Sequence, residues 1–148
     1  MRRLSQGFVV GLLFAIAALD MVTGIRLLTS SEPWLQCGFD RSWAALPEAL
    51  RSDAGLRHFL YGPYALLGAF SFHVGLITMI WTFLGRRNRS LLTILLVAYS
   101  VSGAIFFYVA FSYTRGTDHF FMKQVIGALW ALALLLHFLG PKIPSERS

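Results

Sequence analysis

The sequence predicts an all-α protein, a bundle of four transmembrane helices with both termini on the cytoplasmic side. Three observations lead to this fold class. Of the 148 residues, 56% are hydrophobic and only 14% are charged, too few charges for the surface of a soluble domain of this size. Four apolar runs are long enough to cross a bilayer, which takes about 20 helical residues. The positive charges gather in short segments beside those runs, as is typical of membrane proteins.

The predicted spans cover about residues 7–28, 57–84, 90–113 and 119–139. The link between the second and third spans reads GRRNRS. Cytoplasmic loops carry an excess of Arg and Lys, so we expect this link to be cytoplasmic, and with it both termini. Residues 1–148 then form a single integral membrane domain, and the sequence contains no internal repeat.

The first span follows the basic start Met-Arg-Arg and contains the small-residue triplet AIA at positions 15–17. A cleaved signal peptide is the alternative interpretation of this segment, because such a triplet matches a cleavage site. The apolar pattern continues past the triplet to Leu28, which favours a retained transmembrane helix.

The loop after the first span, residues 29–56, is the longest extramembrane segment. Its basic and acidic residues nearly cancel, as expected of an outer loop. Pro47 can begin a short helix, and Asp53 can cap the second span. Trp34 and Trp43 favour a position at the membrane interface or over the mouth of the bundle. We therefore expect a short interfacial helix here; a ligand lid is the alternative.

Ionisable residues inside the spans are candidate ligand-binding residues, because charges in hydrocarbon are costly. Asp20 lies in the outer half of the first span and needs a proton or a partner. Arg26 on the same helix and Lys123 on the fourth span are its candidate partners. A structural ion pair is one interpretation; in the other, these groups orient the polar head of a small molecule. Tyr61 and Tyr64 would then hold the apolar body of that ligand.

The four histidines lie on two of the predicted spans, His58 and His73 on the second and His119 and His137 on the fourth. Both spans run from outside to inside, so the histidines form an outer and an inner level. This arrangement resembles that of diheme cytochromes b, and the resemblance implies axial ligation of haem. The inner pair, His73 with His137, is the stronger candidate for one b-type haem.

A structural role for His73 is the favoured interpretation, and no cofactor is predicted. We expect its imidazole to point into the bundle and to bond a polar group on the third span, because neutral imidazole in membrane bundles usually bonds a neighbouring helix. The candidate partners are Tyr99, Ser100 and Ser102.

The sequence supports no particular catalytic chemistry. It contains no nucleophile elbow, no phosphate-binding glycine loop and no zinc-ligand spacing. The single cysteine, Cys37, excludes an intrachain disulfide. The positive charge is spread beside the spans and does not form a patch for nucleic acid.

The organisation of the chain resembles that of DoxX-like small four-helix bacterial membrane proteins. The residues that carry the resemblance are 11–34, GLLFAIAALDMVTGIRLLTSSEPW, in which a basic residue ends the span and a proline follows. The resemblance implies a bacterial inner-membrane protein with an accessory role in membrane redox systems. EXPERA sterol-binding proteins share the four-span plan, but residues 59–81 lack the carboxylate of their pocket.

These observations predict a non-enzymatic membrane protein, an accessory or assembly subunit of a larger, redox-linked membrane complex. Its expected partners are the lipid bilayer and other membrane subunits. The alternative is a protein that binds b-type haem, or an apolar small molecule such as a quinone or lipid, between the second and fourth spans.

Overall fold

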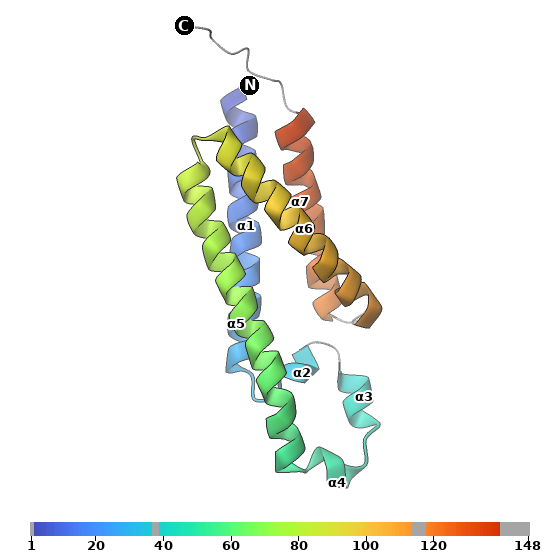
Figure 1. Cartoon of the computed structure of the whole chain (residues 1–148). Helices are drawn as coiled ribbons and strands as arrows, with labels where there is room; N and C mark the ends of the chain where they lie inside the picture. Colours follow the sequence, from blue (N-terminus) through green and yellow to red (C-terminus); the bar gives the residue numbers. More distant parts are fainter. Residues whose placement is uncertain (1, 37–38, 114–117, 140–148) are drawn as a thin grey trace, which may run out of the picture.

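The computed structural model describes residues 2–36, 39–113 and 118–139, and these contain helices and no strand. The prediction of an all-α protein is confirmed. The long helices are α1 (Arg2–Thr29), α5 (Ala54–Gly85), α6 (Arg89–Tyr113) and α7 (Asp118–Leu139). Three short helices connect α1 to α5: α2 (Pro33–Gln36), α3 (Asp40–Ala44) and α4 (Glu48–Arg51) (Figure 1).

Two of the long helices are clearly of membrane length. Gln6–Thr29 of α1 and the whole of α5 are long and apolar enough to cross a bilayer. The apolar stretches described in α6 and α7, Arg89–Ile105 and Gln124–Leu139, are shorter. The predicted first and second spans therefore coincide with membrane-length helices, and the third and fourth fall on shorter apolar ones.

The antiparallel helices α1 and α5 are in close contact, because glycine removes the side chains where the backbones meet. A Cβ atom on Gly24 would lie 2.6 Å from the carbonyl oxygen of Gly68. A Cβ atom on Gly75 would lie 2.6 Å from the carbonyl oxygen of Ala17. Ala17 and Gly24 are seven residues apart, as are Gly68 and Gly75, so the contact repeats after two helical turns. This repeat sets the register of the pair.

The buried face of α5 consists of small residues, which allow close approach between membrane helices. Their spacing alternates between three and four residues, which keeps them on one side of the helix. They are Gly68, Ser71, Gly75, Thr78, Thr82 and Gly85. The large apolar side chains of α5 are exposed on other faces, Leu66 and Phe70 among them.

The helices α6 and α7 pack on α1 through a conventional apolar core. Val9 and Leu13 of α1 are fully buried against Leu92 and Leu96 of α6 and Ala133 of α7. Figure 1 shows α6 running obliquely across α1, with α7 beside it. α1 thus lies between α5 and α7, and α6 contacts both α5 and α7.

The start of α1, the α5–α6 turn and the end of α7 lie at the same end of the molecule (Figure 1). Gln6 Nε2 donates a hydrogen bond of 3.0 Å to the carbonyl oxygen of Arg86, next to that turn. Arg89 Nη2 donates one of 2.6 Å to the carbonyl oxygen of His137. The basic link and both ends of the bundle are therefore neighbours in space.

At the opposite end, α5 extends beyond α1 and carries the short helices (Figure 1). The predicted helix start and cap are confirmed there. α4 begins directly after Pro47, and Asp53 Oδ1 accepts a hydrogen bond of 2.7 Å from the backbone N–H of Leu56 in the first turn of α5. The α5 helix is thus longer at its start than the predicted span, which began at Arg57.

The glycine contact predicts an asymmetry between two glycines of α1. Gly24→Ala places a methyl group against the backbone of α5, and overpacking of this kind costs about 1–3 kcal/mol. Gly11→Ala is the matched control, because nothing lies within 4 Å of a Cβ atom there. In a titration with denaturing detergent, we expect Gly24→Ala to lower the free energy of unfolding clearly and Gly11→Ala to leave it unchanged. Equal effects would contradict the register.

Candidate functional site

The most deeply placed acidic group, Asp20, bonds to a tyrosine of α6. Asp20 is only 5% exposed, and Tyr99 donates its hydroxyl proton to Oδ2 of the carboxyl group. Tyr99 also lies against Trp130 of α7, with ring centroids 6.4 Å apart. One carboxyl group and two aromatic rings thus join α1, α6 and α7. We call these three residues the Asp20 cluster.

The indole nitrogen of Trp130 adds a second polar feature to this cluster. Trp130 Nε1 is buried and has no hydrogen-bond partner among the described residues. A buried donor without an acceptor costs about 1–3 kcal/mol. The cluster therefore offers an N–H group that a polar acceptor on a bound molecule would satisfy.

The other residues predicted to bind a ligand do not converge on Asp20. Arg26 is exposed, and the side chain of Lys123 lies outside the described residues. Tyr61 donates a hydrogen bond of 3.3 Å to the carbonyl oxygen of Leu28. That carbonyl is eight residues from Asp20, or about 12 Å along α1. Tyr64 packs edge-on against Phe39, with ring centroids 6.2 Å apart, so both tyrosines contact residues at the end of the bundle opposite the α5–α6 turn.

The prediction that His73 points into the bundle is wrong. Its side chain is exposed, and Nδ1 lies 2.9 Å from the carbonyl oxygen of Ala69 on its own helix. The predicted partner Ser100 instead donates to Leu96 of its own helix, at 2.7 Å. The small-residue face of α5 occupies the α1 contact, so the position of His73 on the helix turns its ring outward.

The imidazole of His137 is buried and forms a tie between α7 and α6. His137 is 6% exposed, and its Nε2 lies 2.7 Å from Thr93 Oγ1. Since the Thr93 hydroxyl donates to the carbonyl oxygen of Arg89 at 2.9 Å, it accepts from a protonated Nε2. Together with the bond from Arg89 to the carbonyl oxygen of His137, two hydrogen bonds therefore join α6 and α7 here.

The candidate haem ligands are therefore dispersed. His73 is exposed on α5, whereas His137 is enclosed between α6 and α7 and bonded through Nε2. His58 is exposed near the start of α5, and the side chain of His119 lies outside the described residues. Within the described residues, no three His, Cys, Asp or Glu side chains are grouped to hold a metal ion.

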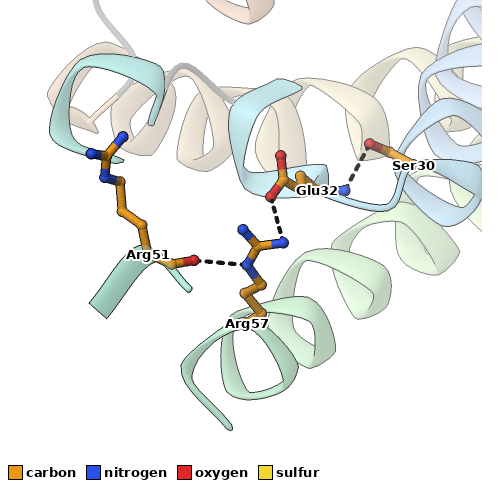
Figure 2. Close-up of polar contacts among 4 residues, drawn as sticks. All are labelled: Ser30, Glu32, Arg51 and Arg57. Carbon is orange, nitrogen blue, oxygen red and sulfur yellow. Dashed lines mark hydrogen bonds and ion pairs between the residues drawn. The ribbon is translucent and has the colours of Figure 1, made fainter. Parts of the chain in front are cut away.

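Arg57 of α5 makes two polar contacts with the segment between α1 and α5 (Figure 2). Arg57 Nη1 lies 3.4 Å from Glu32 Oε1, and its Nε donates a hydrogen bond of 2.8 Å to the carbonyl oxygen of Arg51. Beside this contact, Trp34 is 1% exposed, and its ring lies 5.2 Å from that of Trp43. The predicted interfacial segment thus has an apolar core of its own.

Two of the residues that make these contacts were not identified as such from the sequence. Tyr99 is one of three predicted partners of His73 and instead bonds Asp20, and the sequence gives no signal for the contact of Thr93 with His137. Counting residues from the basic end does place Tyr99 near the level of His73, but it does not show on which side of α6 the hydroxyl lies. The sequence therefore predicts the position of Tyr99 along the helix axis, but not the direction in which its side chain points.

Comparison with known proteins identifies no relative. No protein-family model matches the chain, and no curated protein or solved structure is significantly similar to it. The DoxX-like resemblance stays a prediction.

The bond between Asp20 and Tyr99 predicts coupled effects on stability. Tyr99→Phe removes the donor and leaves a buried acceptor, which should lower the free energy of unfolding by about 1–2 kcal/mol. After Asp20→Leu, the same tyrosine substitution should have a much smaller effect. The measurement is a double-mutant cycle by unfolding in detergent. Additive effects would show that the two side chains do not interact.

The arginine contact predicts a local effect at the outer end. Exposed ion pairs contribute about 0–1 kcal/mol, so Arg57→Gln should leave global unfolding nearly unchanged. Opening of residues 30–52 should become more frequent, and proteinase K should cleave there faster. Glu32→Gln should act in the same direction. Glu48→Gln is the control, because this acidic residue is exposed and lies outside the Arg57 contact; faster cleavage in this variant would contradict a specific role of the pair.

Proposed function

We propose that this chain is a polytopic membrane protein and a non-enzymatic accessory or assembly subunit of a larger complex in a bacterial inner membrane. In this proposal the four long helices all cross the bilayer and both termini are cytoplasmic. The bundle contributes surfaces for other membrane subunits, and its buried polar groups hold its own helices together.

The observation that carries the membrane assignment is the exposure of large apolar side chains. Large apolar residues are exposed on all four long helices, for example Phe8, Phe70, Ile105 and Leu135. The buried polar residues of the described chain include Asp20, Ser71, Thr78, Thr82 and His137. A core helix of a soluble protein would be mostly buried, whereas 33% of the apolar window of α1 and 28% of that of α5 are buried. Lipid is the solvent that suits such a surface.

The orientation rests on the basic end of the bundle. Arg86, Arg87 and Arg89 lie at the α5–α6 turn, beside the start of α1 and the end of α7. The excess of basic residues in short cytoplasmic links favours that end for the cytoplasm. The longer outer segment then lies on the opposite face.

The accessory role is supported by the contacts of the polar side chains, which bond other parts of the same chain. Asp20 and His137 both bond side chains of α6, and Arg57 holds the outer segment. These are contacts that fix helix order. The DoxX-like organisation of residues 11–34 points the same way, since that resemblance implies a partner of membrane redox systems.

A second candidate function is favoured by one observation, the unpaired indole N–H of Trp130 beside Tyr99 and Asp20. An apolar molecule with a carbonyl head, such as a quinone or lipid, would satisfy that donor while its body lies in the bilayer. This candidate needs no haem and does not use Tyr61 or Tyr64.

The orientation is tested by thiol labelling in intact cells. A membrane-impermeant maleimide added from outside should label Cys37 of the native chain. With Cys37→Ser as background, Arg87→Cys should react only after the cells are permeabilised. Labelling of both thiols from the outside would reject the proposed topology.

The accessory role is tested by purification from the native membrane in a mild detergent, followed by mass spectrometry of co-purifying chains. We expect one or a few membrane proteins in constant ratio to this chain. Recovery as a monomer without partners would reject the role. The second candidate is tested on the same sample. Bound lipid or quinone is extracted and identified by mass spectrometry, both from the native chain and from Trp130→Phe.

A further inference from the structure

The exposed side of α5 carries one polar group in the middle of an apolar stripe. The stripe consists of Leu66, Phe70, His73, Ile77 and Ile80, all exposed and spaced alternately by three and four residues. Such spacing keeps the side chains on one face of a helix. The face lies apart from the small residues that pack on α1. We call it the His73 stripe.

The depth of His73 follows from the register of α1 and α5. Gly75 lies opposite Ala17, and Gly68 lies opposite Gly24. His73, two residues before Gly75, is therefore level with Leu19, near the buried Asp20. Twelve residues, or about 18 Å of helix, separate His73 from Gly85 at the basic end. In a hydrocarbon layer of about 30 Å this places the imidazole far from both headgroup regions.

The imidazole presents a hydrogen-bond acceptor outward at that depth. A carbonyl oxygen only accepts, so the contact of 2.9 Å with Ala69 means that Nδ1 carries the proton and donates it. Nε2 of the neutral ring then has a lone pair. The other contact of the ring is with Phe72, edge-on at 6.4 Å between centroids, which provides no donor from the side chain. Lipid tails provide none, and an unmet polar group in hydrocarbon is costly.

We propose that the His73 stripe is the docking surface for a transmembrane helix of a different membrane protein, which places a hydrogen-bond donor at the level of His73. The inference rests on the membrane location proposed above, and it specifies the face and the chemistry of the partner. A hydroxyl or amide side chain among small residues would suit, since such groups bond across helices in membranes.

A second copy of this chain suits the stripe poorly. Two copies with the same topology are related by an axis along the membrane normal, so their α5 helices would be parallel and His73 would meet its own equivalent. Two Nε2 lone pairs would then face each other without a proton. A helix from another protein avoids this conflict. Neither α6 nor α7 replaces it, because the stripe residues stay exposed although α6 contacts another part of α5.

The test is site-specific photocrosslinking of the full chain in its native membrane. A photoreactive amino acid is placed at Phe70 or Ile77 on the stripe. The controls carry it at Val22 of α1 or Val101 of α6, which are equally apolar and exposed. We expect both stripe positions to crosslink to one and the same membrane protein, and the control positions to give no such product.

The role of the imidazole is separated from simple packing by two substitutions. His73→Leu keeps the volume and removes the acceptor, so the crosslink yield should fall about three- to tenfold, the range expected for one interhelical hydrogen bond. His73→Gln restores an acceptor oxygen and should retain the yield within about twofold. An unchanged yield in His73→Leu would overturn the proposal.

Three other outcomes would overturn the inference while leaving the accessory role intact. The stripe positions could crosslink to a second copy of the chain, or the known co-purifying partner could crosslink through Val101 instead. A b-type Soret band in the purified complex that disappears in His73→Gln would show that Nε2 binds iron. Absence of any co-purifying protein would instead reject the proposed function itself.

Discussion

The approach of the α1 and α5 backbones at Gly24, Gly68 and Gly75 is the constraint on which the rest of the structure depends. A side chain at any of these positions would meet backbone or Cβ atoms within 3 Å. The contact fixes how far α5 extends beyond α1, and thus where the outer segment begins. It also fixes which residues of α5 turn away from the bundle, His73 among them.

The two interfaces of α1 use different physical means. Toward α5 it relies on glycines, which let the two backbones come into direct van der Waals contact. Toward α6 and α7 it uses large apolar side chains, and Asp20 adds a bond to Tyr99. The tie of Thr93 and Arg89 to His137 adds a second polar link at the basic end. Polar groups therefore connect α6 to both α1 and α7.

The outer segment is a small structural unit of its own. Trp34 and Trp43 give it an apolar centre, while Arg57 and Tyr64 connect it to the part of α5 that projects past α1. This arrangement explains why the tyrosines of α5 have structural contacts. They lie at the end of the bundle, about two helical turns from Asp20, and not around it.

The sequence by itself determined the helical class, the membrane-length character of the first two long segments, the Asp53 cap and the helix start after Pro47. These features depend on composition, on apolar runs and on local backbone chemistry, which neighbouring residues decide. It also placed Tyr99 near the depth of His73, because depth follows from counting residues along a helix. Only the tertiary structure decided direction around the helix axis. The small-residue face of α5 meets α1, so His73 is turned outward, and α6 crosses α1 with Tyr99 toward Asp20. Since most positions of these helices are apolar, no amphipathic pattern in the sequence distinguishes the packed face from the exposed face.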